Sequence, residues 1–368
     1  MKIGILKEHK KDERRVAISP NIAKQLIDKG FEILLEDGAG ESSSFKNSDY
    51  KTIGASVEKR GVVFKEATIL IKINPFDNED LKLVDKGHIL MSQLFHISNK
   101  ELIKAIAAKG ATAFSMDAMP RITRAQDMDV LSSQNNLAGY KAVIKGAYEM
   151  TKIFPLMMTA AGTITPSRVL IYGIGVAGLQ AIATAKRLGA VVEATDIRLE
   201  TKEQAESLGA KFITVDNSGE QESEGGYAKE ASEDYARRQK EAVDASLFKA
   251  DLVITTAMVP GRKSPVLITK DQVKQMKNGA VIIDLAAAQG GNCELSKMNK
   301  PMLKHGVKIF GTTIAPESVS TNASDLYAKN MFNFLVHLTN EDCEFNWDLE
   351  EEITNGTLIV HQGKIKKN

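Results

Sequence analysis

Short apolar runs alternate with amphipathic segments along the first part of the chain. The apolar runs have the length and composition of buried strands, and the segments between them carry apolar residues at helical intervals. Ser19, Pro20 and Gly30 are suited to cap, begin and end the first helix. We therefore expect parallel strands joined by helices, with strands or strand–turn units at 2–6, 31–40, 67–75, 88–94 and 111–116 and helices at 19–30 and 99–110.

A longer helical pattern runs from Ser132 to Phe154 and is expected to lead from one domain into a second. Strand and helix patterns then alternate again over 168–313, and a last helical pattern follows from about Pro316. The expected fold is α/β, with two Rossmann-like doubly wound parallel-sheet domains and a cleft between them. The expected bounds are 1–132 plus 314–368 for a discontinuous N-terminal domain and 133–313 for the second domain.

Composition narrows the class of protein. Lys and Arg number 48 against 47 Asp and Glu, so the net charge of +1 gives no surplus for nucleic acid or an anionic membrane. The two cysteines, Cys293 and Cys343, cannot form a disulfide framework, and no apolar run has the length of an export signal or a membrane span. We expect a soluble, cytoplasmic chain. No His/Cys cluster has the spacing of a metal site, so no metal is expected.

A glycine motif marks a candidate dinucleotide site. Gly173, Gly175 and Gly178 have the G-x-G-x-x-G spacing, between a predicted strand and a predicted helix. Such a motif binds a pyrophosphate through backbone N–H groups at a helix N-terminus. Asp196 ends the next predicted strand, where a carboxylate accepts the hydroxyls of an adenosine ribose and repels a 2′-phosphate. NAD is therefore favoured over NADP, although the neighbouring Arg198 is a residue type that can hold a 2′-phosphate.

Three further residues are assigned to the same site. Ile197 lies between Asp196 and Arg198, and Val176 lies between the glycines, where it either faces the pyrophosphate or fills a turn. Met258 follows the next predicted strand, at the carboxyl end where ligands bind to such sheets. Spacing alone does not separate this role of Met258 from core packing.

Two polar stretches have both a structural and a functional interpretation. The stretch 121–134, "RITRAQDMDVLSSQ", is typical of a solvated loop that leads into a helix, but it concentrates charged and hydrogen-bonding groups. The stretch 217–243 is charged, contains glycine and is poor in large apolar residues. It predicts either a surface helix and loop or a mobile segment, because it cannot contribute much to a core.

Several blocks of sequence together carry a family resemblance: "PRITRAQDMDVLSSQNNLAGYKAVIKGAY", "GIGVAGLQAIATAKRLGAVVEATD", "GGYAKE", "TTAMVPGR" and "DLAAAQGGNCELS". In order and over nearly the whole chain, they resemble the NAD(H)-binding component of proton-translocating nicotinamide nucleotide transhydrogenase. The chain is most similar to the separate alpha-1 subunit of the bacterial type. The resemblance implies that a partner subunit binds NADP(H) and that another spans the membrane.

The resemblance also implies roles for individual residues. In the family, the loop that matches 121–132 holds the nicotinamide end of NAD(H), and Arg121, Gln126, Asp129 and Ser132 fall on it. Arg121, Gln126 and Asp129 are the expected catalytic set, because Arg121 and Asp129 can pair with each other and with the ligand. Arg124 and Asp127 are expected to be solvated.

The stretch 217–243 matches the family's mobile loop, which closes over the nucleotide. Gly226 and Tyr227 are expected to contact the NAD and Gln239 to lie at the base of the loop. A closed loop would exclude water during hydride transfer and open for exchange.

The implied activity is hydride transfer between NAD(H) on this chain and NADP(H) on a partner, coupled to proton translocation. The resemblance also implies a homodimer, attached through its partner subunits to the cytoplasmic face of the inner membrane. Hydride exchange between two nicotinamide rings needs no general base, because no proton moves at the reacting carbons.

Alanine dehydrogenase has the same architecture and is the competing interpretation. Arg15, Lys72 and His96 are similar to residues of its keto-acid site, although a structural ion pair for Arg15 and Lys72 and a core or loop position for His96 are simpler. Ala288 stands where that enzyme has a catalytic aspartate, and that enzyme lacks the 121–129 loop. A third class, a non-catalytic NAD sensor, would not need to position the reactive ring.

Overall fold

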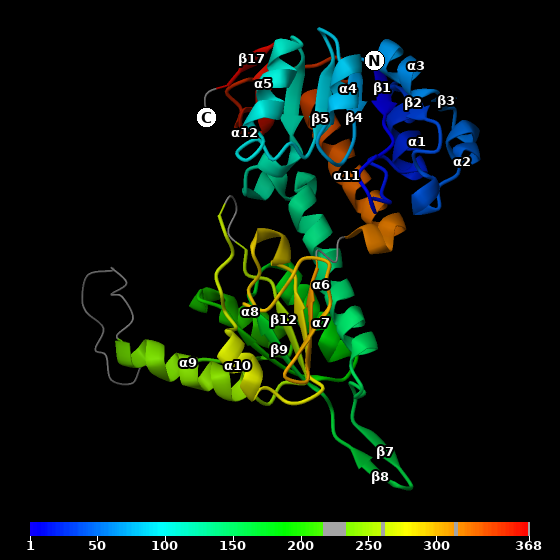
Figure 1. Cartoon of the computed structure of the whole chain (residues 1–368). Coiled ribbons are helices and arrows are strands. Elements are labelled where there is room, and N and C mark those ends of the chain that lie inside the picture. The colour runs from blue at the N-terminus through cyan, green and yellow to red at the C-terminus, as the bar shows by residue number, and fades with distance from the viewer. Residues whose placement is uncertain (216–232, 259–261, 313–315, 367–368) are drawn as a thin grey trace. The chain divides into compact units, whose positions relative to one another are not determined.

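The computed structural model describes residues 1–215, 233–258, 262–312 and 316–366. It divides into two compact units, the first formed by Met1–Gln134 with Pro316–Asn368 and the second by Asn135–Ala315. Each unit has a largely parallel sheet with helices on both faces, which confirms the predicted α/β class (Figure 1). Within these described ranges, no helix combines the length and apolar character that crossing a bilayer requires.

The sheet of the first unit has eight strands in the order β17-β16-β6-β5-β4-β1-β2-β3. The six strands from β1 to β6 are parallel, whereas β16 pairs antiparallel with β6 and β17 antiparallel with β16. The parallel sheet that we predicted is therefore mixed at one edge. The strands are β1 Lys2–Ile5, β2 Glu32–Glu36, β3 Ser56–Glu58, β4 Ile69–Ile71, β5 Ile89–Ser92, β6 Thr112–Ser115, β16 Leu358–His361 and β17 Lys364–Ile365.

Helices cover both faces of this sheet. One core contains α1 and α11, and the other lies beneath α3, α4 and α5. The α-helices are α1 Pro20–Asp28, α2 Asn47–Thr52, α3 Arg60–Glu66, α4 Asn78–Leu83, α5 Lys100–Ala108, α11 Ser320–Leu338 and α12 Glu352–Thr357. The short 3₁₀ turns are η1 Glu41–Ser43, η2 Met116–Ala118, η3 Thr123–Met128 and η6 Pro316–Val319.

The first helix begins where the sequence predicts, but its cap differs. Pro20 occupies the first helical position and Ser19 the N-cap, where its hydroxyl makes no capping hydrogen bond. The Ser19 Oγ is buried and has no partner among the described residues. The chain leaves the helix through Gly30, whose φ of +107° suits glycine.

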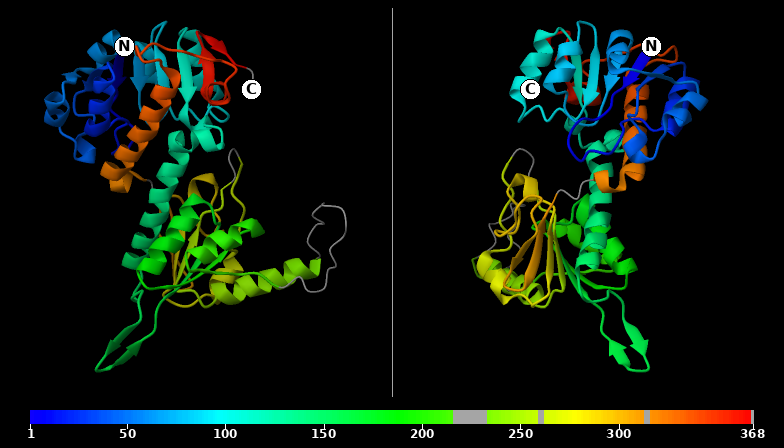
Figure 2. Two further views of the ribbon diagram at one scale, coloured as in Figure 1. Left: turned by 180° about the vertical axis from the view of Figure 1, so that it is seen from behind. Right: turned by 45° about the vertical axis from the view of Figure 1, so that its right-hand side comes forward.

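Helix α11 brings the chain back to the first unit, as the predicted return implies. Tyr327, Met331 and Phe334 on this helix are fully buried in the core beside α1 and the strands. Figure 2 shows α11, in orange, lying along the sheet of the first unit. The apolar spacing in this stretch thus forms one face of a helix that covers the sheet.

The sheet of the second unit has seven strands in the order β11-β10-β9-β12-β13-β15-β14. All pairs are parallel except β14 with β15. The strands are β9 Arg168–Tyr172, β10 Val191–Thr195, β11 Lys211–Phe212, β12 Leu252–Thr255, β13 Val281–Asp284, β14 Met302–Lys304 and β15 Val307–Gly311. The helices are α6 Val130–Glu149, α7 Val176–Arg187, α8 Lys202–Ser207, α9 Glu233–Leu247 and α10 Lys270–Gln275, with 3₁₀ turns η4 Leu199–Thr201 and η5 Ala287–Gln289.

Two glycines let α6 approach the second unit closely. A Cβ atom at Gly139 would lie 2.1 Å from the carbonyl oxygen of Ala177, and one at Gly146 would lie 2.6 Å from the side chain of Leu252. Ala142 and Val143, between these glycines, are fully buried. The long helix predicted from the sequence therefore packs against the start of α7 and against the sheet.

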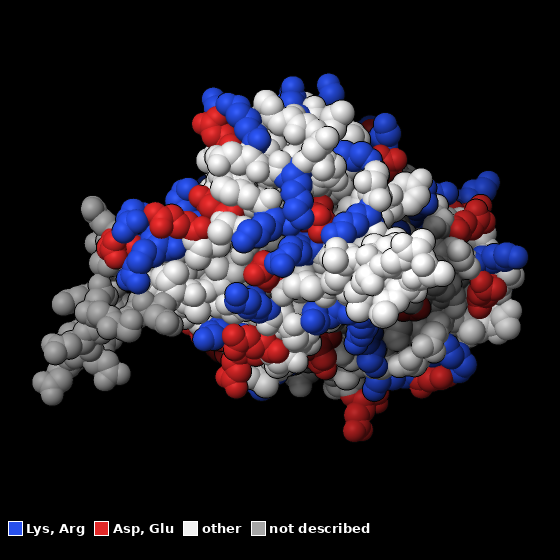
Figure 3. Space-filling model, turned by 90° about the horizontal axis from the view of Figure 1, so that it is seen from below, with Lys and Arg blue, Asp and Glu red and all other residues white. Residues whose placement is uncertain are grey.

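A two-stranded hairpin, which the sequence did not predict, extends from the second unit. Its strands are β7 Met157–Thr159 and β8 Gly162–Ile164, paired antiparallel. The residues from 157 to 164 are all exposed, and Met158 exposes 78% of its surface. The hairpin projects beyond the other elements of its unit in every view (Figure 2), and the face seen from below includes an uncharged area flanked by Lys and Arg (Figure 3).

Candidate functional site

The three motif glycines differ in what surrounds them. Gly173 follows β9 with a φ of +90°, and a Cβ atom there would lie 2.7 Å from the Thr256 Oγ1. A Cβ atom at Gly178 would lie 1.9 Å from the carbonyl oxygen of Gly173. At Gly175, in contrast, a Cβ atom would meet nothing within 4 Å. Packing within the protein explains Gly173 and Gly178, whereas the space beside Gly175 is open for a ligand to approach the backbone.

The helix that follows supplies the groups that bind an anion. Gly175 is the N-cap of α7, and the helix begins at Val176, which is 38% exposed. The first N–H groups of an α-helix have no partner within the helix, and its dipole favours negative charge at this end. The residues present therefore fit a pyrophosphate at the N-terminus of α7.

Asp196 ties the glycine turn to the end of β10. Its carboxylate accepts hydrogen bonds from the Ile174 N–H (2.6 Å), the Arg198 N–H (2.9 Å) and the Arg198 Nε and Nη2 (both 3.0 Å). Burial raises the pKa of Asp196, but the Arg198 side chain and the two N–H groups outweigh it and hold the pKa below its usual value. Asp196 is therefore ionised at neutral pH.

Arg198 is directed back onto the turn rather than outward. Besides its two bonds to Asp196, its Nη2 donates to the carbonyl oxygen of Ile174 at 3.3 Å. Ile197, between the two charged residues, exposes 97% of its surface. The sequence left open whether Arg198 could hold a phosphate, and the structure shows it neutralised by Asp196.

The segment after β12 is fixed by a residue that the sequence did not single out. The Thr256 Oγ1 donates to the Gly173 carbonyl oxygen at 3.0 Å, which joins this segment to the glycine turn. The fully buried Asn292 accepts from the Ala257 N–H (3.1 Å) and donates to the carbonyl oxygens of Ala257 and Pro265 (both 2.8 Å). Met258 follows directly and is 38% exposed, so it is not a core residue.

A buried carboxylate holds Asn292 in place. Asp284, at the end of β13, accepts hydrogen bonds from the N–H groups of Asn292 (2.9 Å) and Cys293 (3.0 Å) and from the Thr255 hydroxyl (3.0 Å). It is fully buried. The bonds of Thr255 with Asp284 and of Ala257 with Asn292 join residues 29 and 35 positions apart, so no local sequence pattern indicates them.

The polar stretch 121–134 forms η3 and the first turn of α6. Ala125 and Met128 are buried in the core of the first unit, whereas Arg121 and Gln126 are exposed. The Asp129 carboxylate caps α6, accepting from the Ser132 N–H at 3.0 Å and from its hydroxyl at 2.6 Å. The predicted set is therefore divided: Asp129 and Ser132 contact each other, and the pair that we expected between Arg121 and Asp129 is replaced by this cap.

Helix α11 holds this loop from the other side. Asn330 and Asn333 both donate to the carbonyl oxygen of Asp127, at 2.7 and 3.1 Å. Arg124, which we expected to be solvated, is 3.2 Å from the Glu351 carboxylate although 66% of its side chain is exposed. The buried residues and these polar contacts fix the backbone of the loop, so Arg121 and Gln126 project from a rigid support.

The stretch 217–243 is described only from residue 233 onward, where α9 begins. Gln239 donates from Nε2 to the Ile213 carbonyl oxygen (2.8 Å) and accepts the Val215 N–H (3.1 Å). It thus anchors the chain that follows β11. Gly226 and Tyr227 lie outside the described residues.

Arg15 and Lys72 are each engaged with a different acidic residue. Arg15 is 6% exposed and forms an ion pair with Glu13 at 2.6 Å. Lys72 is 2% exposed and lies 2.7 Å from the Asp80 carboxylate. Burial lowers the pKa of Lys72, against the attraction of nearby acidic groups. The simpler structural role foreseen for both residues fits these contacts.

His96 lies in the loop after β5. Its Nδ1 is buried and has no hydrogen-bond partner among the described residues. Ala288, in η5 after β13, is exposed and offers no group for proton transfer.

Comparison with known proteins matches the chain over both units. Residues 4–138 match the family "Alanine dehydrogenase/PNT, N-terminal domain", and residues 142–368 match "Alanine dehydrogenase/PNT, C-terminal domain". The first of the two polypeptides of the NAD(P) transhydrogenase alpha subunit from Rhodospirillum rubrum is 49% identical over 99% of this chain and 97% of that protein.

Two solved structures share the fold. A transhydrogenase from Sinorhizobium meliloti has a TM-score of 0.91 and 40% identity, and each chain covers 100% of the other. An L-alanine dehydrogenase has a TM-score of 0.81 and 24% identity, over 99% of this chain and 96% of that chain. The second likeness shows the fold alone.

Proposed function

Because the chain belongs to the alanine dehydrogenase/PNT family, we propose that it is the NAD(H)-binding subunit of an NAD(P) transhydrogenase. The observation that carries the proposal is the open space at Gly175, beside the N-terminus of α7. Gly173, Gly175, Val176 and Gly178 would hold the pyrophosphate there.

The adenosine end determines the choice between NAD and NADP. An ionised Asp196 would accept the ribose hydroxyls and repel a 2′-phosphate. Arg198 gives two donors to Asp196, which weakens the case for it as a phosphate ligand. Ile197, almost fully exposed, would offer an apolar surface to the adenosine. The site therefore favours NAD(H).

At the nicotinamide end, Arg121, Gln126, Asp129 and Ser132 would bind the carboxamide and ribose. Asp129 keeps acceptor capacity beyond its bonds to Ser132, because a carboxylate has about four lone-pair sites. Arg121 and Gln126 are exposed on a rigid loop and are available to a ligand. None of these residues needs to change its protonation state during turnover.

Four more residues complete the proposed site. Gly226 and Tyr227 would contact the bound nucleotide from the stretch 217–243, which is anchored at Gln239. Met258, held half-exposed beside the glycine turn by the Asn292 bonds, would line the same site.

The proposed reaction is NADPH + NAD⁺ → NADP⁺ + NADH. The hydride passes between the C4 atoms of two nicotinamide rings, and NADP(H) is bound by a partner subunit. Coupling to proton translocation occurs in a membrane-spanning partner, which holds this subunit on the cytoplasmic face of the inner membrane. The chain is active only with these partners, and the residues described here bind and orient one of the two nucleotides.

We also propose that the subunit is a homodimer. The support is the β7–β8 hairpin, which exposes an apolar surface that includes Leu156 (58% exposed), Met158 (78%) and Ile164 (41%). A charge-free segment of this kind on a projecting hairpin is typical of a surface that another chain covers.

Alanine dehydrogenase is the alternative, favoured only by the Nδ1 of His96, which is buried without a partner among the described residues. Amino-acid oxidation needs a general base. Ala288 cannot act as one, and the ion pairs of Arg15 and Lys72 already engage these cations. These observations support transhydrogenase over the dehydrogenase.

One experiment separates the candidate functions. The purified protein is mixed with NADH, a transhydrogenase NADP-binding component and NADP⁺, and separately with NADH, pyruvate and ammonium. NADH oxidation is expected in the first mixture only. Oxidation in the second mixture alone would identify an alanine dehydrogenase, and NADH binding without oxidation in either would identify an NAD sensor.

A further inference from the structure

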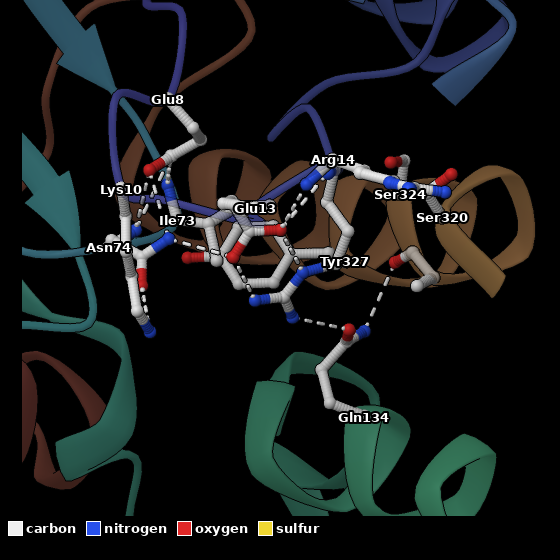
Figure 4. A network of polar contacts seen from close by, with 12 residues as sticks. Glu8, Lys10, Glu13, Arg14, Ile73, Asn74, Gln134, Ser320, Ser324 and Tyr327 are labelled. Carbon is white, nitrogen blue, oxygen red and sulfur yellow. Dashed lines mark hydrogen bonds and ion pairs between the residues drawn. The ribbon is translucent and has the colours of Figure 1, made fainter. Parts of the chain in front are cut away.

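A chain of buried side chains joins the loop after β4 to the first turns of α6 (Figure 4). Glu8 accepts the N–H groups of Ile73 (2.5 Å) and Asn74 (3.3 Å). The Asn74 Nδ2 then donates both to Glu8 (3.0 Å) and to Glu13 (2.8 Å). The Glu13 carboxylate is thereby fixed relative to the sheet of the first unit.

Arg15 continues this chain to Gln134. Its Nε and Nη2 donate to the two oxygens of Glu13, at 2.8 and 2.6 Å. Its Nη1 donates to the Gln134 Oε1 at 2.8 Å. Burial raises the pKa of Glu13, but the hydrogen bonds and charge of Arg15 and the Asn74 amide outweigh it, so the pKa is lowered and Glu13 stays ionised. The planar guanidinium thus bridges a fixed carboxylate and one amide.

Gln134 lies five residues beyond Asp129, two residues after Ser132. It is 6% exposed, and its Nε2 donates to the Ala323 carbonyl oxygen on α11 at 3.1 Å. Its two amide atoms therefore fix the start of α6 against the sheet through Arg15 and against α11. Ser133 adds a bond to Asn330 at 2.7 Å.

We propose that Arg15 and Gln134 are positioning residues for the nicotinamide loop. Neither touches the nucleotide. They hold the first turns of α6 in one orientation, and Asp129 and Ser132, which belong to that turn, are thereby aimed at the nicotinamide end of NAD(H). The inference rests on the proposed function, and it gives Arg15, which resembles a keto-acid ligand, a different role.

Comparing two ligands tests this role. The dissociation constants of NADH and of ADP-ribose, which lacks the nicotinamide, are measured by isothermal titration calorimetry. If the loop binds the nicotinamide, wild-type protein binds NADH more tightly than ADP-ribose. In Gln134→Met, which keeps the volume but accepts no hydrogen bond, the ratio of the two constants is expected to fall by about tenfold, with ADP-ribose affinity unchanged.

Matched variants separate positioning from general loss of stability. Gln134→Glu keeps an acceptor for Arg15 and is expected to retain most of the wild-type ratio. Tyr50→Phe removes another buried hydrogen bond of the same unit, from the Tyr50 hydroxyl to the Ile18 carbonyl oxygen, and should leave the ratio unchanged. If Gln134→Met does not fold, Arg15→Lys replaces it, because lysine cannot reach Glu13 and Gln134 with the same fork.

The outcomes are distinguishable. A wild-type ratio above one that Gln134→Met and Arg15→Lys leave unchanged would overturn the positioning role alone. An equal loss in Tyr50→Phe would also overturn it, because the effect would then follow stability. Wild-type protein that binds neither ligand, or both equally, would remove the nicotinamide site itself and with it the proposed function.

Discussion

At the scale of single residues, the glycine motif contains two kinds of constraint. Gly173 and Gly178 are required by the protein's own packing, and Gly175 faces open space. The sequence predicts all three and also Asp196, because each occupies a fixed offset from a strand or helix end. It does not predict Asn292 or the Asp284 that holds it, because their partners are set by contacts between distant strands.

The two kinds of glycine should respond differently to alanine. Gly175→Ala is expected to fold with nearly wild-type stability, since its φ of −91° suits any residue, but to weaken NADH binding at least tenfold. Gly178→Ala forces a contact with the Gly173 carbonyl oxygen and should destabilise the protein by about 1–3 kcal/mol. Chemical denaturation and calorimetric titration measure the two effects. Equal destabilisation by both variants would contradict this distinction.

Asp196 should also leave a signature in the pH dependence of stability. Because folding lowers its pKa, the ionised form stabilises the folded state above the unfolded pKa of about 4, and this contribution is lost as the pH falls through the folded pKa. Asp196→Asn is therefore expected to be less stable than wild type at pH 6, with the difference shrinking toward pH 3. Denaturant unfolding across this range measures it, and a difference independent of pH would contradict the assignment.

At the scale of elements, long apolar runs and the α6 and α11 patterns were sufficient for prediction. Strands β3, β14, β16 and β17 and the β7–β8 hairpin were not predicted. They are two to four residues long, which is too short for a periodicity to be read, and most lie at sheet edges or outside the sheets. The predicted roles of Gly226 and Tyr227 stay predictions, since these residues lie outside the described ranges.

The segment after β12 depends on a single amide. Asn292→Asp keeps the shape but cannot donate to the Ala257 and Pro265 carbonyl oxygens, and it places a charge in a fully buried position. We expect a loss of about 2–4 kcal/mol in the free energy of unfolding and weaker NADH binding, because Met258 would no longer be held beside the glycine turn. Gln239→Glu, at a half-exposed amide of the same unit, is the comparison. An Asn292→Asp protein with wild-type stability and NADH affinity would contradict this.

At the scale of the whole molecule, the sequence predicted two α/β halves, and the structure divides into two units near the expected positions. It did not predict the projecting hairpin, since Thr, Ala and Gly at its turn give no strong strand signal. An association surface of this kind is chosen by the partner it contacts, and a single sequence carries little information about that choice.

The proposed dimer depends on the hairpin. Replacing Leu156 and Met158 by Lys adds charge to an exposed apolar surface and is expected to yield a monomer that still binds NADH. Sedimentation equilibrium measures the mass, and Leu303→Lys, at a comparably exposed apolar site on β14, is the control. A dimer that survives the double substitution would remove the hairpin from the interface.

The contact between Asn330 and the Asp127 carbonyl oxygen spans 203 positions of the chain. During synthesis on a ribosome, residues 135–315 emerge and can fold before α11 exists, because their sheet is complete without it. The nicotinamide loop is therefore assembled last, after α11 has emerged. A ribosome stalled before Ser320 would display a finished pyrophosphate turn and an unsupported loop, so the nascent protein would acquire its grip on the two ends of the dinucleotide in a fixed temporal order.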